Sequence, residues 1–319
     1  MNLQENLEGE GLLPFLTRIT IRKLMTSNPY ILRSIINLAL RPTLDQKSYI
    51  YNISNEYCKG SIIMENIASS KDDWTAIQRL KLADIIIFEI HGLCPKNPYP
   101  IAKNHCLQTF QYLVYQLGIS PLKIVITCDS AGGSLALEML IDMYAPRILE
   151  NVHNNLDAPR ENFDMPIPAG AFFSSPLVSA DTSTPSYQKN HKKDIVSMKL
   201  SKILYKEYMV MPDRNFPDNI PVMHLQDIRY GFARFLPRQI LVYVGTKESL
   251  LDSVIRWVTD MKEDGGSINV QLHLEPYYHD WFMCPLLVKK KNRAIIDKYT
   301  QLFVDWAVHA VQQANDSAK

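Results

Sequence analysis

The sequence has little of three features, and each scarcity argues against a class of protein. Neither charge is in excess: 34 Lys and Arg residues face 33 Asp and Glu residues, a formal net charge of +1. A nucleic-acid-binding protein needs a basic surface for the phosphate backbone, so that class is disfavoured. The chain also lacks the run of about 18 to 20 apolar residues that a membrane-spanning helix needs. Its 319 residues, 46% of them hydrophobic, suffice for one large α/β domain with insertions.

Paired cysteines are the third scarcity. The five cysteines, at positions 58, 94, 106, 128 and 284, form no CxxC pair, so we expect reduced thiols. His105–Cys106 and His91 with Cys94 have no second pair at ligand spacing, which argues against a metal site. The first eleven residues are acidic and polar, unlike a signal peptide. We therefore expect a cytoplasmic protein, with peripheral attachment to the endoplasmic reticulum membrane as the alternative.

Residues 12–40 have the pattern of an amphipathic helix, in which apolar residues such as Leu16 and Ile19 alternate with Arg18 and Arg22. Two interpretations are open. The helix packs over a core with its apolar stripe, or its basic face lies on a membrane surface.

After residue 42 the pattern changes to short apolar runs that alternate with helical stretches. The runs lie at 48–53, 84–90, 123–127, 169–173, 239–244 and 269–274. Nearly continuous apolar strands separated by helices indicate a mostly parallel sheet with helices on both faces. The polar stretch 183–238 is expected to be an insertion between two strands, and 293–311 a final covering helix.

The sharpest local signal is the segment Cys128-Asp129-Ser130-Ala131-Gly132, between an expected strand and an expected helix over 134–144. A nucleophile elbow needs small residues two before and two after the serine, because the strained turn must close tightly. The serine hydroxyl then stands above the sheet, and the N–H of Ala131 points at an oxyanion. The alternative is an ordinary glycine-rich turn capped by Ser130.

Two later loops offer partners for Ser130 in the chain order of a serine hydrolase, nucleophile, then acid, then histidine. The loop after strand 239–244 carries Glu248 and Asp252, and the loop after strand 269–274 carries His279. Because all of these residues follow parallel strands, they should meet at the carboxyl edge of the sheet. His279 would take the Ser130 proton, Glu248 would orient the imidazole, and Asp252 is the reserve acid.

These residues resemble the hormone-sensitive-lipase-like branch of the α/β-hydrolases. Cys128–Gly133 resembles its G-D-S-A-G-G elbow, with Cys in place of the first Gly, and 93–100 resembles its Y-R-L-A-P-E-x-P-Y-P segment. Ser174-Ser175-Pro176-Leu177 and the stretch 185–194 are similar to fungal members, including steryl acetyl hydrolases. The resemblance covers about residues 48–310 and implies an α/β-hydrolase fold and ester hydrolysis.

One motif of the family is not recognisable. The H-G-G-G loop, whose N–H groups complete the oxyanion hole, is expected at Ile53-Ser54-Asn55-Glu56, which holds no glycine and adds a carboxylate. His91-Gly92 lies instead where the Y-R-L-A-P segment belongs. Loss of one oxyanion donor costs about 10²–10³ in turnover. The strands that usually precede this loop are not visible either, because residues 1–45 have the pattern of helix and loop.

We therefore expect an α/β-hydrolase domain over 46–315, with a helical cap made of the segment 1–45 and an insertion at about 183–235. The expected activity is hydrolysis of carboxylic esters of small or lipid-like alcohols by Ser130, His279 and Glu248, without a cofactor. The alternative is a catalytically impaired hydrolase fold that binds an apolar ligand or a protein. The expected partners are an ester substrate and, through residues 12–40, a membrane surface.

Overall fold

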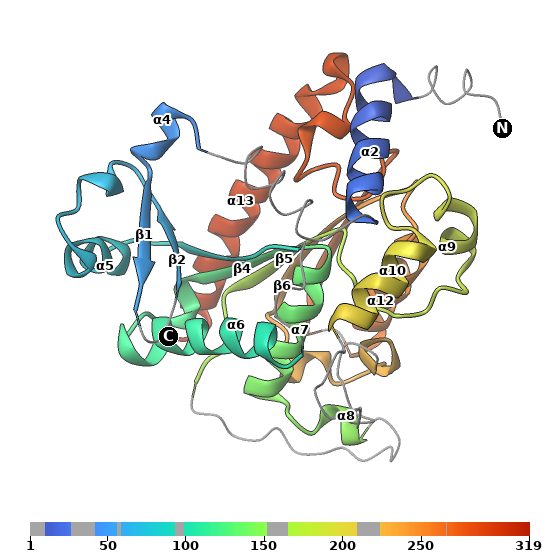
Figure 1. Ribbon diagram of the computed structural model, residues 1–319. Coiled ribbons are helices and arrows are strands. Elements are labelled where there is room, and N and C mark those ends of the chain that lie inside the picture. The colour runs from blue at the N-terminus through green and yellow to red at the C-terminus, as the bar shows by residue number, and fades with distance from the viewer. Residues whose placement is uncertain are drawn as a thin grey trace.

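The computed structural model of the chain describes residues 10–26, 42–55, 59–92, 99–151, 165–208, 224–265 and 267–319. Its centre is a sheet of five parallel strands in the order β3-β4-β5-β6-β7 (Figure 1). The strands are β3 (Ile86–Ile90), β4 (Ile124–Asp129), β5 (Gly170–Ser174), β6 (Gln239–Gly245) and β7 (Asn269–Glu275). The parallel sheet and its strands confirm the predicted fold class, and the boundaries differ from the predicted ones by one or two residues.

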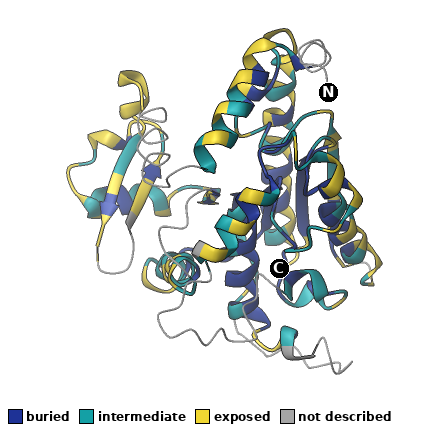
Figure 2. Ribbon diagram, turned by 45° about the vertical axis from the view of Figure 1, so that its right-hand side comes forward, coloured by how far each residue is buried: buried dark blue, intermediate teal, exposed yellow. Residues whose placement is uncertain are grey.

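Helices cover both faces of this sheet. Successive strands lie side by side, so right-handed crossovers place their connecting helices on one face: α6 (Ile101–Gln111), α7 (Ala131–Tyr144) and α12 (Leu251–Glu263). The long C-terminal helix α13 (Ala294–Asp316) packs on the other face. Side chains that alternate along β4 divide between the two cores, with Ile124 and Ile126 in the larger and Val125 in the smaller. Figure 2 shows the strands as the most buried part of the molecule.

One predicted strand does not join this sheet. The run expected at 48–53 becomes β1 (Ile50–Ser54), which pairs antiparallel with β2 (Lys59–Ile63) in a separate two-stranded sheet. Figures 1 and 2 both show this hairpin to one side of the main sheet. The reason is visible in its burial, because Ile53 is the only residue of β1 that is buried. Such a half-polar strand suits a small satellite core better than a sheet covered on both faces. The neighbouring helices are α4 (Leu44–Lys47) and α5 (Asp73–Lys81).

The segments expected to form a cap lie on the side of the sheet where the strands end. Helix α2 (Leu12–Met25) realises part of the amphipathic stretch 12–40, of which residues 27–41 lie outside the described part. The insertion contributes α9 (Pro185–Asn190) and α10 (Met198–Tyr208), and its residues 209–223 are outside the description too. Arg18 of α2 donates to the carbonyl of Lys193, and Arg22 Nη1 to that of Asp194 at 3.0 Å, so α2 is tied to the insertion.

The remaining elements are short: η1 (Ile67–Ser69), η2 (Tyr112–Gln116), η3 (Pro121–Lys123), α8 (Ile148–Asn151), η4 (Leu225–Asp227), η5 (Phe232–Arg234), η6 (Pro285–Leu287) and η7 (Lys290–Asn292). Among the helices described, none is both long enough and apolar enough to cross a bilayer.

Candidate active site

Ser130 stands at the sharp turn between β4 and α7. Its backbone has φ 49° and ψ −121°, a conformation that costs a non-glycine residue about 1–3 kcal/mol. The turn is held from the next strand along the sheet, because Ser130 N donates to Ser174 O at 3.0 Å. Its carbonyl accepts from Gly133 N at 3.0 Å and from Leu177 N at 2.8 Å. The Ser130 side chain does not cap α7, which removes the interpretation of an ordinary capped turn.

Small residues let the turn close as the sequence predicts. A Cβ on Gly132 would overlap the carbonyl oxygen of Ile90, and one on Gly133 would lie 2.7 Å from Pro176 Cβ. Cys128, which replaces a glycine of the resembling motif, points into the core and donates its thiol to Phe172 O at 3.4 Å. Burial raises the pKa of the Cys128 thiol well above its ordinary value, so it is no nucleophile.

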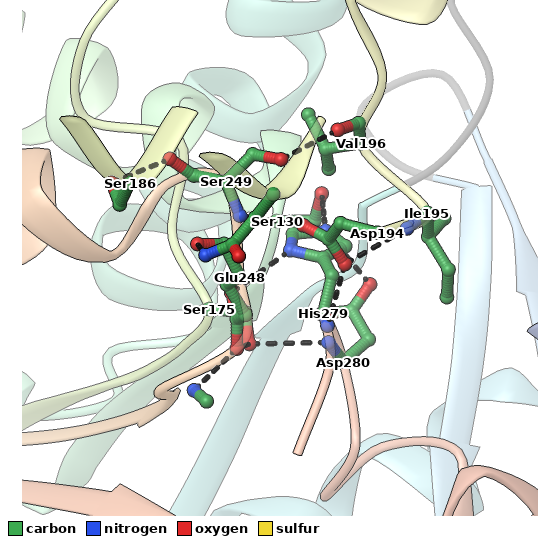
Figure 3. Close-up of polar contacts among 12 residues, drawn as sticks. Ser130, Ser175, Ser186, Asp194, Ile195, Val196, Glu248, Ser249, His279 and Asp280 are labelled. Atoms are coloured by element: carbon green, nitrogen blue, oxygen red, sulfur yellow. Dashed lines mark hydrogen bonds and ion pairs between the residues drawn. The ribbon is translucent and has the colours of Figure 1, made fainter. Parts of the chain in front are cut away.

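The predicted histidine and acid meet Ser130 at the carboxyl edge of the sheet (Figure 3). His279 Nε2 lies 2.8 Å from Ser130 Oγ, and His279 Nδ1 lies 3.1 Å from Glu248 Oε2. Both partners of the serine are fully enclosed, with exposures of 1% for His279 and 0% for Glu248. The arrangement is a relay in which the imidazole bridges a hydroxyl and a carboxylate.

Glu248 is itself held in place from two sides. Its Oε1 accepts a hydrogen bond of 2.6 Å from Ser175 Oγ and one of 2.5 Å from Gly245 N. Ser175 follows β5 with a positive φ of 46°, so its hydroxyl reaches the site from the same sheet edge. In the sequence, Ser174-Ser175-Pro176-Leu177 stands out only through the family resemblance. The position of Ser175 directly after a predicted strand is the signal that identifies it.

Asp194 is a second residue that sequence reasoning missed as part of the site. Its buried carboxylate accepts from three backbone N–H groups: Oδ1 from Ile195 at 2.8 Å and His279 at 3.1 Å, and Oδ2 from Ser249 at 2.7 Å. Burial raises the pKa of Asp194 to about 6, against the opposing effect of His279. The carboxylate thus joins the insertion to the loops that carry the histidine and the acid.

Asp280 is the third residue of the site that the sequence analysis did not identify. Its Oδ2 lies 3.2 Å from His279 Nε2, the nitrogen that also faces Ser130. Burial raises the pKa of the Asp280 carboxyl well above its ordinary value, although the His279 charge opposes this. Burial alone would lower the pKa of His279, but the carboxylates of Asp280, Glu248 and Asp194 outweigh it and raise that pKa to about 10.

Asp252, the reserve acid, does not approach the histidine. Its Oδ2 accepts from Ser186 N at 2.6 Å, and its own N donates to Ser186 Oγ at 3.0 Å. This reciprocal pair joins the start of α12 to the start of α9. The structure therefore assigns the contact with the imidazole to Glu248 and leaves Asp252 in a structural role.

The oxyanion side of the site differs from the expected one. Ala131 is the first residue of α7, so its N–H has no acceptor within the helix. The expected second segment is elsewhere: Ile53 and Ser54 belong to the separate hairpin, and Glu56 lies outside the described residues. Gly92 stands beside the nucleophile instead, where its N–H donates to Asp129 Oδ1 at 2.8 Å. An added Cβ on Gly92 would lie 2.9 Å from Ser130 Cβ.

Sequence order misled here because β3, not β1, pairs with the elbow strand β4. The loop after β3 therefore reaches Ser130, and residues 93–98 of that loop lie outside the description. Within the described ranges no group of three or more His, Cys, Asp or Glu side chains has the spacing to hold a metal ion.

With the geometry established, comparison with known proteins identifies the family. A model of the alpha/beta hydrolase fold matches residues 60–283, more than half of the chain. The chain belongs to this family. A protein named Esterase from Acinetobacter venetianus is 28% identical to this chain over 198 residues. Those residues are 61% of this chain and 55% of the relative, so the chain spans about half the length of the curated relative it matches.

Solved structures share the fold of this chain. EstE5 has a TM-score of 0.62 at 16% identity, with 91% of this chain and 98% of that chain covered. An esterase/lipase from an uncultured bacterium has a TM-score of 0.60 at 17% identity, with the same coverage of 91% and 98%. A homologue of hormone-sensitive lipase from a metagenome library, EstE7, has a TM-score of 0.61 at 16% identity, covering 94% and 99%.

Proposed function

We propose that this hydrolase cleaves carboxylic esters with Ser130 as nucleophile, His279 as general base and acid, and Glu248 as the orienting carboxylate. The observation that carries the proposal is the continuous contact from Ser130 Oγ through both ring nitrogens of His279 to Glu248 Oε2, at 2.8 and 3.1 Å. The relative from Acinetobacter, named an esterase, supports the reaction class. The resemblance to the hormone-sensitive-lipase-like branch supports it further.

The chemistry follows from the positions of the protons. Ser130 Oγ attacks the ester carbonyl while its proton passes to His279 Nε2, and the N–H of Ala131 donates to the oxyanion that forms. Collapse of this intermediate breaks the bond to the alcohol oxygen, which takes the proton from Nε2. Water then releases the acid from Ser130 by the same sequence. Glu248 keeps the other ring proton on Nδ1 and stabilises the imidazolium.

A fluorophosphonate probe tests the proposal directly, because it forms a bond only with an activated serine. We expect covalent labelling of the wild type and none of Ser130→Ala. Ser61→Ala is the matched control, since the Ser61 hydroxyl donates to Asn52 on the exposed hairpin. Labelling that persists in Ser130→Ala would refute the assignment of the nucleophile. A wild type that is folded but unlabelled at every pH from 7 to 9.5 would favour the alternative, a hydrolase fold that binds an apolar ligand or a protein.

The cap follows from the same proposal. We propose that α2 and the insertion at about 183–235 form the helical cap of the site. Arg18 donates to the carbonyl of Lys193 in the insertion, and Arg22 donates to that of Asp194. A cap over the nucleophile selects the alcohol and acyl groups that enter, and we propose esters of small or lipid-like alcohols as the substrates.

Contact with a membrane surface belongs to this proposal too. Helix α2 exposes Leu12, Leu13 and Leu16 by 63%, 53% and 50%, and exposed Lys290 and Lys291 follow the short helix η6, on which α2 packs. Apolar side chains beside lysines favour an anionic lipid surface. We expect the protein to float with vesicles of phosphatidylcholine and phosphatidylserine, and Leu13→Ser with Leu16→Ser to abolish flotation. Equal flotation of both proteins would contradict this surface.

A further inference from the structure

The imidazole of His279 has one contact more than a serine relay needs. Its Nδ1 faces Glu248 Oε2 at 3.1 Å, while its Nε2 faces both Ser130 Oγ at 2.8 Å and Asp280 Oδ2 at 3.2 Å. Figure 3 shows the Asp280 side chain beside the ring. Two oxygen atoms of different chemistry therefore compete for one nitrogen.

The proton count of this arrangement is restrictive. A neutral imidazole has one N–H, and a contact with the Glu248 carboxylate keeps that proton on Nδ1. Nε2 then presents a lone pair, which accepts the Ser130 hydroxyl but repels an ionised Asp280. The contact of 3.2 Å is favourable only when an additional proton lies between His279 Nε2 and Asp280 Oδ2.

The backbone keeps Asp280 at this place. Its φ is 58°, its N–H donates to Ser175 Oγ at 3.2 Å, and its carbonyl accepts from Cys284 N at 2.9 Å. The side chain is 16% exposed, and its Oδ1 is enclosed with no hydrogen-bond donor in the described part of the chain. His279 is therefore the positive partner that this carboxylate contacts.

The other charged groups around the imidazole act in the same direction. Glu248 faces it from the acid loop, Asp194 from the insertion and Asp129 from the elbow, and all three are acidic. On β3, Glu89 bonds to Thr127, and His91 lies near Asp129. From α2, Arg18 approaches Asp194 but is paired with Glu10 at 2.6 Å. The surroundings thus favour a positive imidazole.

We propose that Asp280 is a positioning residue that holds a proton on His279 Nε2 and so restrains the general base until the solution is alkaline. The proposal rests on the proposed hydrolase function for its effect on rate. Ser130 can transfer its proton only when His279 Nε2 carries no proton, so the proton shared with Asp280 must first leave to solvent. Ester hydrolysis then rises with pH well above the range of an ordinary histidine.

The experiment is a nuclear magnetic resonance titration of the full chain with isotopically labelled histidines, in which His279→Gln assigns the His279 signal. Asp280→Asn keeps the shape and tolerates the positive φ, and Asp280→Gly removes the side chain at a φ that suits glycine. Asp252→Asn is the matched control, because it removes one carboxylate that contacts Ser186 rather than His279. Circular dichroism confirms that each variant is folded.

We expect the titration midpoint of His279 to fall by about one pH unit or more, a tenfold change in proton affinity, in both Asp280 variants and not in Asp252→Asn. The rate profile for p-nitrophenyl butyrate should move with it: for a fall of one unit from about 10, kcat/KM rises about tenfold at pH 7 and about threefold at pH 9.5. An unchanged midpoint overturns the proposal, as does an equal shift in Asp252→Asn. If no protein is labelled by fluorophosphonate at any pH, the hydrolase function fails, while the titration still decides the role of Asp280.

Discussion

At the scale of single residues, the site is defined by carboxylates that surround His279 and differ in what they touch. Glu248 receives hydrogen bonds from Ser175 and Gly245 and faces Nδ1. Asp194 bonds to backbone alone. Asp280 faces Nε2 with one oxygen and has no donor for the other among the described residues. The role of each carboxylate therefore follows from the groups around it, because all three side chains carry the same functional group.

The first prediction separates the two acids that the sequence offered. Glu248→Gln keeps the shape but replaces the charge that stabilises the imidazolium, so kcat for an activated ester should fall about 10²–10⁴-fold. Asp252→Asn should leave kcat close to wild type, because Asp252 accepts from Ser186 N and an amide oxygen still does so. Steady-state kinetics at pH 9 checks both. A larger loss in Asp252→Asn than in Glu248→Gln would reverse the assignment.

At the scale of elements, the decisive feature is how closely β4, α7 and the neighbouring strand β3 approach one another. The space beside Gly132 is filled by the carbonyl of Ile90, and the space beside Gly133 by Pro176. The elbow therefore depends on contacts with both neighbouring strands, and the strained φ of Ser130 is maintained by them.

Gly132→Ala should consequently destabilise the fold. The added methyl group has no space against backbone, and we expect a loss of about 2–3 kcal/mol or more in the free energy of unfolding. Gly60→Ala is the control, because nothing lies within 4 Å of a Cβ at this strand position, and its change should stay within about 1 kcal/mol. Urea unfolding followed by circular dichroism measures both. Equal stabilities for the two variants would show that the elbow is not tightly closed.

At the scale of the whole molecule, Asp194 joins parts of the chain that are far apart in sequence. Its bonds to Ser249 and His279 span 55 and 85 residues, and its carbonyl accepts from Arg22 of α2. The insertion thus supports the acid loop, the histidine loop and the N-terminal helix together. Loss of this carboxylate should therefore affect stability and catalysis at once.

Asp194→Ala leaves three backbone N–H groups without their acceptor. A buried donor without a partner costs about 1–3 kcal/mol, so a loss of about 3 kcal/mol or more in the free energy of unfolding is expected. Asp194→Asn should lose less, since its amide oxygen still accepts. Thermal unfolding of the three proteins at pH 7.5 tests this order. A variant Asp194→Ala as stable as wild type would contradict the bridging role.

The raised pKa of His279, about 10, also makes stability depend on pH. A base whose pKa is higher in the folded than in the unfolded state contributes stability below about 6.5, and this contribution is lost as the pH rises through the folded value. We expect the Tm to fall steadily from pH 7 to pH 9.5. The fall should be smaller in His279→Gln, which has no titrating ring. Parallel curves for the two proteins would show that His279 does not carry the effect.

Much of the fold was predictable because it depends on local pattern. The apolar runs that became β3 to β7 follow from hydrophobic periodicity, and their boundaries lie within two residues of the predicted ones. The final helix α13 begins one residue after its predicted start and ends five residues beyond its predicted end. The run at 48–53 was correctly predicted to be a strand but was assigned to the wrong sheet. Pairing partners depend on which surfaces meet in space, and a single strand does not encode them. The oxyanion segment was misplaced for the same reason.

The sequence by itself determined that Ser130, Glu248 and His279 follow parallel strands, and strands of that kind bring their carboxyl ends to one edge. Only the tertiary structure decided which further groups surround the imidazole. Asp280 contacts its Nε2, while Ser175 bonds to Glu248 and Asp194 accepts from the backbone N–H of His279. These contacts arise from positive φ angles or from the meeting of distant loops. Such contacts depend on how whole elements are placed relative to one another in space, which residue order and hydrophobic pattern do not specify.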